Sequence, residues 1–329
     1  MSPRDSGRGP AMRPFQPLST QRVQQLLGDR YAVVRELGAG GTAIVFLAHD
    51  HVRGHPVAVK VLRPELSVAV VAARFLREIE IGQRLSHPNV LRVYEYALVE
   101  GELFCTMPFV DGETLRERLA RETQLTLADT LRIARAVACA LDYAHGLDLI
   151  HRDIKPANIL LDGEKVVVAD FGMARAMSAA ATSDLTETGL AIGTAAYMSP
   201  EQGCAERALT GRSDLYSLAC VVYEMLVGEP PFTGPTARSI IVRHCQEPPR
   251  SIRVVRPSIP MGVQRAVEKA LAKVPTDRFA TAGEFLDAIK AGVTDVELET
   301  PSLRGSAGKA KLVAVKHWMS EVRAKLARL

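Results

Sequence analysis

Five polar residues follow one another in a short stretch that lies between two apolar runs. In chain order they are His151, Arg152, Asp153, Lys155 and Asn158. Side chains of these types can move protons, offset negative charge and ligate metal ions. The apolar runs at 147–150 and 159–161 indicate short buried strands on either side of a loop, and loops pinned by strands often carry catalytic groups. We therefore expect a rigidly held catalytic loop here.

A carboxylate stands at the end of another apolar run. Residues 166–169 lead into Asp170-Phe171-Gly172, twelve residues after Asn158. At the end of a buried strand Asp170 offers a hard oxygen ligand for a divalent cation, whereas an isolated aspartate there would be an ordinary turn residue. The two stretches in this order resemble the protein kinases, whose H-R-D-L-x-x-x-N-like catalytic loop is followed by D-F-G.

The other sequence features of that family are present in the expected order. They are the glycine-rich stretch Leu37-Gly38-Ala39-Gly40-Gly41-Thr42-Ala43-Ile44-Val45, the strand Val57-Ala58-Val59-Lys60, Glu78, Gly193-Thr194, Ser199-Pro200-Glu201, Asp214 and Arg278. The resemblance covers residues 31–291, most of the chain. Within the family, the chain is most similar to the bacterial eukaryotic-like Ser/Thr kinases, on the runs 197–202 and 278–281.

The resemblance implies an α+β bilobal protein kinase fold, with a small β-rich N-lobe that holds one helix and a larger, mainly α-helical C-lobe. The implied divisions are a disordered leader and short helix at 1–28, a kinase domain at 31–291 (N-lobe 31–107, hinge 108–112, C-lobe 113–291), a linker at 292–308 and a basic amphipathic helix at 309–329. Patterning predicts helices at 21–27, 67–85, 114–122 and 127–145, strands at 31–36, 93–96 and 103–106, and a helix capped at 213–217 and closed at Gly228.

The implied nucleotide site combines the glycine-rich hairpin with the hinge. Its residues are Leu37, Gly38, Ala39, Gly40, Gly41, Val45, Ala58, Lys60, Met107, Pro108 and Val110. Glycines let backbone N–H groups approach the ATP phosphates, and Ala43, which replaces the family's third glycine, stiffens the loop. Pro108 lacks a backbone donor but keeps the carbonyl acceptor that would hold the adenine edge. Taken alone, the glycine-rich stretch would be a plain hairpin turn.

The implied catalytic residues come from both lobes. Lys60 would direct its ammonium group at the α- and β-phosphates when it pairs with Glu78, whereas without that pair both would be solvated surface charges. Asp153 would accept or orient the proton of the attacking hydroxyl, and Lys155 would offset the charge of the transferring phosphoryl group. The Asp-x-Lys order is that of the Ser/Thr kinases, since tyrosine kinases place an Arg elsewhere in this loop.

Asn158 and Asp170 are the implied ligands of the metal that accompanies ATP, which is Mg²⁺ with Mn²⁺ as an alternative. His151 has a structural role in this interpretation and packs beneath Phe171.

Residues 173–192 are small and polar, so we expect this segment to stay mobile until something orders it. Phosphate on Thr186 or Thr188 would order it by bonding to Arg152. Three further roles are implied by the resemblance: Thr194 supports a Ser/Thr acceptor beside the catalytic Asp and Lys, Asp214 braces the catalytic-loop backbone, and Glu201 forms a buried structural ion pair with Arg278.

Composition sets the broad class of the protein. With 329 residues, 47% hydrophobic and 24% charged, the chain is an ordinary soluble globular protein, and its net charge of +4 gives no argument for a nucleic-acid partner. The scattered cysteines, at 105, 139, 204, 220 and 245, indicate reduced core thiols rather than a metal site or a disulfide framework. No apolar run approaches the about 18 residues that cross a bilayer, and residues 1–19 lack the apolar centre of a signal peptide, so we expect a cytoplasmic protein.

The segment 309–329 has apolar residues at alternating three- and four-residue spacing, with basic residues on its other sides. Such a helix could dock on its own C-lobe, lie on a membrane surface, bind a partner protein or form a short oligomer seam. The sequence leaves these alternatives open.

The function that the resemblance implies is that of a Ser/Thr protein kinase. It would transfer the γ-phosphoryl group of Mg-ATP to Ser/Thr hydroxyls of protein substrates, and would be activated by autophosphorylation in trans within 182–188. A pseudokinase-like nucleotide-binding scaffold is the alternative, disfavoured because Lys60, Asp153, Asn158 and Asp170 are all present. A small-molecule kinase is disfavoured by the peptide-platform segment at 193–201. A homodimer is suggested only by analogy with related bacterial kinases.

Overall fold

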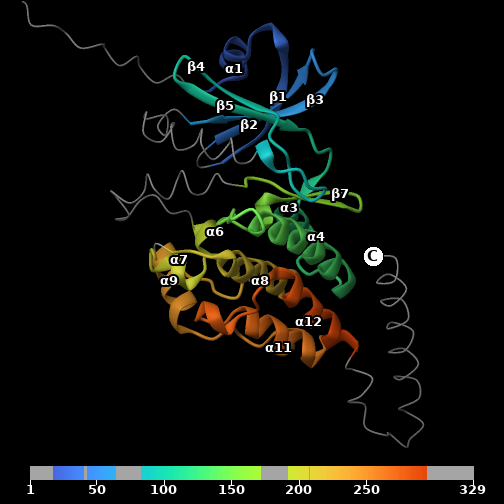
Figure 1. Ribbon diagram of the computed structural model, residues 1–329, viewed down its shortest axis with the longest axis vertical. Helices are drawn as coiled ribbons and strands as arrows, with labels where there is room; N and C mark the ends of the chain where they lie inside the picture. Colours follow the sequence, from blue (N-terminus) through green and yellow to red (C-terminus); the bar gives the residue numbers. More distant parts are fainter. Residues whose placement is uncertain (1–17, 41–42, 64–82, 172–191, 207, 295–329) are drawn as a thin grey trace, which may run out of the picture. The chain divides into compact units, whose positions relative to one another are not determined.

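A computed structural model describes residues 18–40, 43–63, 83–171, 192–206 and 208–294 of the chain (Figure 1). The chain divides into two compact units. The first comprises Met1–Ala72 and Tyr94–Phe109, and the second comprises Ala73–Val93 and Val110–Leu329. The first is built mainly from strands and the second mainly from helices, as the α+β bilobal prediction requires.

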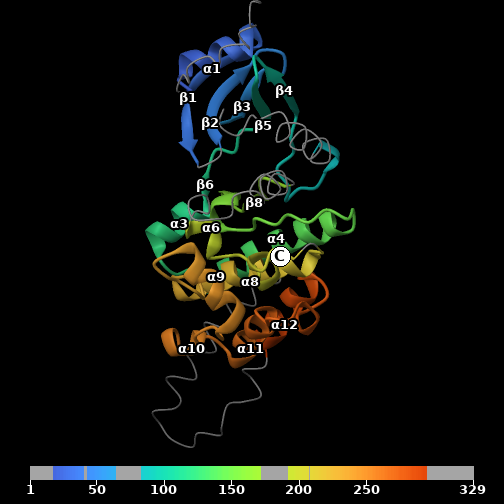
Figure 2. The same cartoon turned by 90° about the vertical axis from the view of Figure 1, so that its left-hand side faces the viewer.

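The first unit is an antiparallel five-stranded sheet in the order β1-β2-β3-β5-β4. Its strands are β1 (Tyr31–Ala39), β2 (Ala43–Asp50), β3 (His55–Leu62), β4 (Glu95–Val99) and β5 (Glu102–Pro108). The predicted helix is α1 (Thr20–Leu27), which begins at the capping hydroxyl of Ser19 and ends at Gly28, where φ is +63°. Figure 2 shows α1 beside β1, and a short 3-10 turn, η1 (Gly28–Arg30), joins the two.

One face of this sheet carries the core of the first unit. Alternate residues of β2, β3 and β5 point into it, with Phe46, Val59 and Phe104 among them. Val23 and Leu27 of α1 pack against the same cluster. This cluster uses one face of the sheet, and the opposite face carries a second set of side chains, of which Ala58, Cys105 and Met107 are also buried.

The second unit is mainly helical. Its elements are β6 (Glu113–Thr114), α3 (Leu115–Glu122), α4 (Leu127–His145), η3 (Pro156–Asn158), β7 (Ile159–Asp162), β8 (Lys165–Val168), α6 (Ile192–Ala195), α7 (Pro200–Gly203), α8 (Gly211–Val227), α9 (Ala237–Gln246), α10 (Ile252–Val255), α11 (Met261–Ala270), η5 (Pro275–Asp277) and α12 (Ala282–Thr294). The three short strands form one sheet in the order β6-β7-β8.

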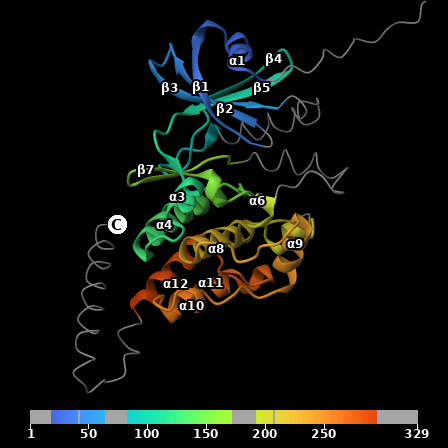
Figure 3. The same ribbon diagram turned by 180° about the vertical axis from the view of Figure 1, so that it is seen from behind.

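Helix α8 is the centre of the second unit. From Ser213 to Val227 every residue is buried, as expected for a helix that is apolar on all sides. It lies between α4 and α11 (Figure 3) and ends at Gly228, whose φ of +97° favours glycine. Because the central helix is rigidly packed, side chains that project from its ends are held firmly in place.

The helix predicted at 127–145 is confirmed with the same bounds, and α3 begins one residue after the predicted start, at the capping box of Thr114. Strand β4 begins at Glu95 rather than at 93, and α8 begins at Gly211, before the predicted cap at 213. The predicted strand at 147–150 is wrong. The chain turns there directly after α4, Asp148 has a φ of +57°, and Leu147 is 54% exposed.

Two of the cysteines predicted to be core thiols are at the surface. Cys139 and Cys204 are exposed and Cys245 is half-buried, whereas Cys105 and Cys220 are buried. Cys139 is exposed because it lies on the polar side of α4, away from the stripe that includes Leu131 and Ala138. Within the described residues, no helix has the length and apolarity that a membrane span requires.

Candidate active site

The backbone of the catalytic loop is held by one buried carboxylate. Asp214, in the first turn of α8, has no exposed surface. Its Oδ2 accepts hydrogen bonds from the backbone N–H of His151 at 2.7 Å and from Nε2 of His145 at 2.8 Å, and its Oδ1 accepts from the backbone N–H of Arg152 at 2.7 Å. These bonds hold Arg152 at a φ of +69°, a strained conformation for a residue with a side chain. The bracing role of Asp214 stays a prediction, and these hydrogen bonds are the contacts through which it would act.

His151 connects the catalytic loop to the segment that follows β8. Its side chain is buried, its Nε2 lies 2.8 Å from the carbonyl oxygen of Ala169, and its Nδ1 accepts from the backbone N–H of Asp153 at 3.2 Å. Its ring meets the edge of Phe171 with 4.5 Å between centroids. Both ring nitrogens are engaged in fixing the backbone, as expected for a structural histidine.

Asp153 lies in a cluster with three other functional side chains, those of Lys155, Asn158 and Thr194. The Nζ of Lys155 lies 2.8 Å from Oδ2 of Asp153 and donates to Oγ1 of Thr194 at 3.1 Å. The Nδ2 of Asn158 donates to the same Oδ2 at 3.1 Å and to the carbonyl oxygen of Asp153 at 2.8 Å. Asp153 and Lys155 keep about a fifth to a quarter of their side chains exposed, at 24% and 21%. The carboxylate is therefore oriented by two donors while its outer side remains accessible.

Asn158 and Asp170 lie on two backbone segments that are next to each other. The carbonyl oxygen of Asn158 accepts from the N–H of Ala169 at 2.9 Å, and Asp170 is the next residue, with a φ of +67°. Because Nδ2 of Asn158 is turned to Asp153, its Oδ1 is the atom left for a cation. The chain thus places Asn158 and Asp170 on neighbouring backbone, and an amide oxygen and a carboxylate are the ligand types that hard cations prefer.

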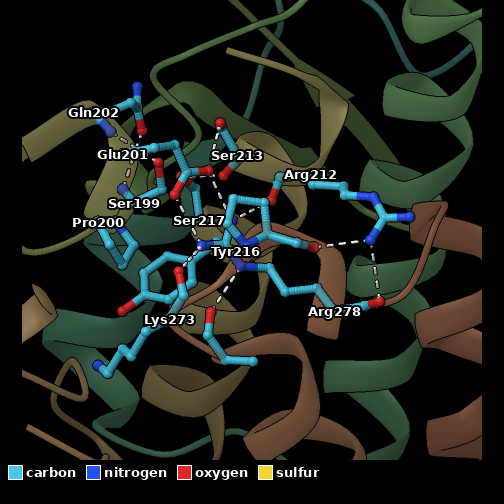
Figure 4. Close-up of polar contacts among 12 residues, drawn as sticks. Ser199, Pro200, Glu201, Gln202, Arg212, Ser213, Tyr216, Ser217, Lys273 and Arg278 are labelled. Atoms are coloured by element: carbon cyan, nitrogen blue, oxygen red, sulfur yellow. Dashed lines mark hydrogen bonds and ion pairs between the residues drawn. The ribbon is translucent and has the colours of Figure 1, made fainter. Parts of the chain in front are cut away.

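Glu201 and Arg278 form a buried, two-pronged ion pair (Figure 4). The Nη1–Oε1 and Nη2–Oε2 distances are 2.7 and 2.8 Å, and the side chains are 0% and 4% exposed for Arg278 and Glu201 respectively. Ser213 also donates to Oε1 at 2.7 Å. Burial raises the pKa of Glu201, but the hydrogen bonds from Arg278 and Ser213 outweigh it and leave that pKa below its usual value.

A further link from α7 to the catalytic loop was not predicted from the sequence. The Nε2 of Gln202 donates to the carbonyl oxygen of Arg152 at 2.8 Å. Gln202 is oriented because its Oε1 accepts from the backbone N–H of Ser199, which completes a capping box at the start of α7. The Ser-x-x-Gln spacing was a signal for the capping box, though not for its bond to the loop.

An open cavity of about 400 Å³ lies beside the catalytic cluster in the second unit. Lys155 and Thr194 line it, together with apolar residues such as Phe232. The cavity is also lined by the carboxylate of Glu224, whose side chain is 3% exposed and forms an ion pair with Arg116 at 2.8 Å. Glu224 and Arg116 both form hydrogen bonds with the hydroxyl of Tyr197. Sequence reasoning missed Arg116 and Glu224, because their partners are distant in sequence.

The strand register places five predicted nucleotide residues on one face of the first unit's sheet. Val45 pairs with both Gly38 and Lys60, and Ala58, two residues before Lys60, pairs with Met107. Residues that face each other across strands or lie two apart along a strand share a face. These five therefore lie on the face opposite the core of that unit.

The glycine-rich hairpin leaves room for a ligand. A Cβ added at Gly38 would meet no described atom within 4 Å, so the fold itself does not require glycine there. The N–H of Gly40 donates to the carbonyl oxygen of Ala43 at 2.8 Å, and its own carbonyl accepts from Arg63 at 3.0 Å, which closes the hairpin. A glycine with open space around it among the described residues suits a ligand that approaches the backbone closely.

The remaining predicted nucleotide residues lie near or just after the ends of β1 and β5. Leu37 sits at an irregularity of β1, Ala39 pairs with Ile44, Pro108 ends β5, and Val110 follows in the second unit. Four predicted site residues lie outside the described residues: Gly41, Glu78, Thr186 and Thr188. The predicted helix at 67–85, apart from its last three residues, and the predicted helix at 309–329 also lie outside them.

One unit is a β-sheet with a lysine on the face opposite its core, and the other is a helical unit with an Asp-Lys-Asn loop followed by a second aspartate. Both features are typical of a protein kinase. Residues 31–288 match the protein kinase domain, so the chain belongs to the protein kinase family. This confirms the predicted family and the predicted bilobal α+β fold.

Named relatives make the likeness more specific. The chain is 39% identical over 277 residues to the serine/threonine-protein kinase PknJ of Mycobacterium tuberculosis, covering 80% of this chain and 46% of that protein. It is 40% identical over 265 residues to PknB of the same species, covering 79% and 42%. The chain thus spans less than half the length of these relatives.

Among solved structures, the chain resembles Rad53 1–466 in complex with AMP-PNP. The TM-score is 0.65 at 26% sequence identity, and the match covers 79% of this chain and 65% of that chain.

Proposed function

We propose that this chain is a Ser/Thr protein kinase that transfers the γ-phosphoryl group of ATP to Ser and Thr hydroxyls of proteins. The observation that carries the proposal is the cluster of Asp153, Lys155 and Thr194 on a loop braced by Asp214. The relatives named above support the Ser/Thr class, since they are called serine/threonine-protein kinases.

In this proposal Asp153 positions the acceptor. Its accessible carboxylate oxygen would accept the hydrogen bond of the incoming hydroxyl and hold its proton as the oxygen attacks. Lys155, fixed by Asp153 and Thr194, would offset the negative charge on the phosphoryl group during transfer. The acceptor peptide would lie along the cavity beside Lys155 and Thr194.

Asn158 and Asp170 would hold a divalent cation, which we propose to be Mg²⁺. The donor set fits, because it supplies one amide oxygen and one carboxylate and leaves the other positions to phosphate oxygens and water. When bound, the cation would supply charge neutralisation at the phosphates. Asn158 has a second task in the chain itself, since its Nδ2 orients Asp153.

The face of the first unit's sheet that lies opposite its core would receive the nucleotide. Ala58, Val45 and Met107 offer an apolar surface for the adenine, and Lys60 on the same face would contact the α- and β-phosphates. Among the described residues, no atom lies within 4 Å of a Cβ built at Gly38, where the phosphates would approach the hairpin. Pairing of Lys60 with Glu78 remains part of the proposal.

Activation is proposed to depend on phosphate at Thr186 or Thr188. Arg152 would contribute a charge-assisted bond to that phosphate next to Asp153. The kinase would modify itself in trans and then other proteins. A homodimer and a role for the basic 309–329 segment at a membrane or a partner stay predictions from the sequence.

Mass spectrometry tests the proposed function. The purified protein is incubated with Mg-ATP beside an Asp153→Asn variant and a control, Asp162→Asn, which changes an exposed aspartate at the end of β7. We expect phosphate on Thr186 or Thr188 in the wild type and the control, and none in Asp153→Asn. Full phosphorylation of Asp153→Asn would overturn its assigned role. ATP binding without any phosphorylation would favour the nucleotide-binding scaffold.

A further inference from the structure

Two cysteine thiols lie next to each other where α7 packs on α9. The Sγ of Cys204, directly after α7, is 3.7 Å from the Sγ of Cys245 in α9. They are 41 residues apart in the sequence, so the fold brings them together. Gly203 makes this approach possible, because a Cβ there would lie 2.6 Å from Cγ2 of Ile241, closer than real contacts allow.

The two thiols differ in access. Cys204 is exposed and Cys245 is half-buried, with its Sγ also 3.8 Å from the carbonyl oxygen of Pro200. Burial, together with the contact to Cys204, raises the pKa of the Cys245 thiol. An oxidant from solution would therefore reach Cys204 first and find a second thiol already in contact behind it.

We propose that Cys204 and Cys245 form a reversible intramolecular disulfide when the protein meets a hydroperoxide. The Cys204 thiolate attacks one peroxide oxygen, the O–O bond breaks, and a sulfenic acid forms with release of water or an alcohol. The Cys245 sulfur then attacks Sγ of Cys204, the S–O bond breaks, and hydroxide leaves as water with the thiol proton. The two sulfurs lose two electrons and the peroxide gains them. A dithiol reductant reverses the step.

The movement that this step needs is small. The Sγ–Sγ distance must fall from 3.7 Å to the disulfide value of about 2.05 Å. Cys204 lies beyond the last turn of a four-residue helix, where the chain is less constrained than inside α9. Rotation about its side-chain bond and a slight shift of this end of α7 would close the gap.

The disulfide would act on the segment that braces the catalytic loop. Cys204 is two residues after Gln202, which bonds to the carbonyl oxygen of Arg152. The backbone N–H groups of Gly203 and Cys204 donate to the carbonyl oxygens of Ser199 and Pro200, both at 2.9 Å. A crosslink to α9 would suppress opening of this turn, so the redox state of the pair would set how firmly α7 is held.

Peptide mapping tests the disulfide without depending on kinase activity. The full chain is treated with hydrogen peroxide, its free thiols are blocked, and its peptides are analysed by mass spectrometry before and after dithiothreitol. We expect a Cys204–Cys245 crosslink in most molecules, absent in Cys204→Ser and in Cys245→Ser but retained in the control Cys139→Ser. Irreversible oxidation of Cys204 without a crosslink, or crosslinks only between chains, would overturn the proposal.

Hydrogen exchange tests the consequence for α7. In the crosslinked protein we expect the amides of Gly203 and Cys204 to exchange about tenfold more slowly, while amides in α4 keep their rates. If the crosslink forms and these two rates do not change, the proposed coupling to α7 is wrong.

Discussion

Replacement of Glu201 by Gln tests whether the ion pair with Arg278 supports the fold. The Arg278 side chain has no exposed surface, and its guanidinium also donates to the backbone carbonyls of Ala272, Arg212 and Lys273 at 2.8, 2.9 and 3.0 Å. Glu201→Gln keeps the shape of the side chain but removes its charge. It also turns an NH₂ group toward a donor, either a guanidinium N–H or the Ser213 hydroxyl.

The size of the effect follows from the contacts that remain. Breaking a buried ion pair by removing one partner costs about 3–5 kcal/mol, because the other charge stays buried. Three backbone carbonyls still surround Arg278, so we expect the lower end, about 3 kcal/mol. For a domain of this size, that loss lowers Tm by about 6–12 °C.

Urea unfolding followed by circular dichroism measures the effect. The control is Glu122→Gln, which removes a partly exposed carboxylate paired with Arg118 at 3.2 Å and should cost less than about 1 kcal/mol. If Glu201→Gln unfolds at the same urea concentration as the control, the ion pair does not support the fold as argued.

Three further predictions concern the catalytic loop and the helical core. Asp214→Asn leaves an NH₂ group facing an N–H donor of the loop, so we expect a loss of about 2–3 kcal/mol in urea unfolding, whereas an unchanged midpoint would contradict the bracing role. Lys155→Ala removes the contacts to Asp153 and Thr194 and should lower kcat about 10²-fold with little change in ATP binding by calorimetry; an unchanged kcat would refute it. Burial, followed by the nearby charge of Lys273, lowers the pKa of His244 to about 4. The unfolded chain therefore binds a proton first as the pH falls, and the free energy of unfolding should drop by about 3 kcal/mol between pH 6.5 and pH 4. A His244→Gln variant that keeps the same pH slope would show that other groups cause it.

Local patterns predicted local structure well. The α4 bounds, the Ser19 cap, the closing Gly228 and the strand at 159–161 could all be read from periodicity and terminal residues, because each depends on neighbours in the sequence. The error at 147–150 has a local cause. Four apolar-rich residues fit a strand and a post-helix turn equally well, and only the hydrogen bonds from 147 and 149 back to Ala144 distinguish them.

Contacts between residues that are distant in the sequence could be identified only once the fold was known. The resemblance to protein kinases supplied Asp214 and the Glu201–Arg278 pair, because the family keeps them at fixed places. Nothing in the sequence predicted that Gln202 bonds to Arg152 or that Cys204 touches Cys245. Those contacts depend on how α7 packs, and a four-residue helix carries too little pattern to reveal its neighbours.

Helix α7 is short, but it contacts Arg278, the catalytic loop and α9. A four-residue helix is not stable alone, so its position is set by its tertiary contacts. Glu201 forms an ion pair with Arg278, Gln202 donates a hydrogen bond to the catalytic loop, and Gly203 allows α7 to pack closely on α9. Weakening the Glu201–Arg278 pair should make the hydrogen bond from Gln202 to the Arg152 carbonyl less stable. A Cys204–Cys245 crosslink should make the same hydrogen bond more stable. Hydrogen exchange of α7 in Glu201→Gln, reduced and then oxidised, would show faster and then slower exchange if one segment transmits both effects.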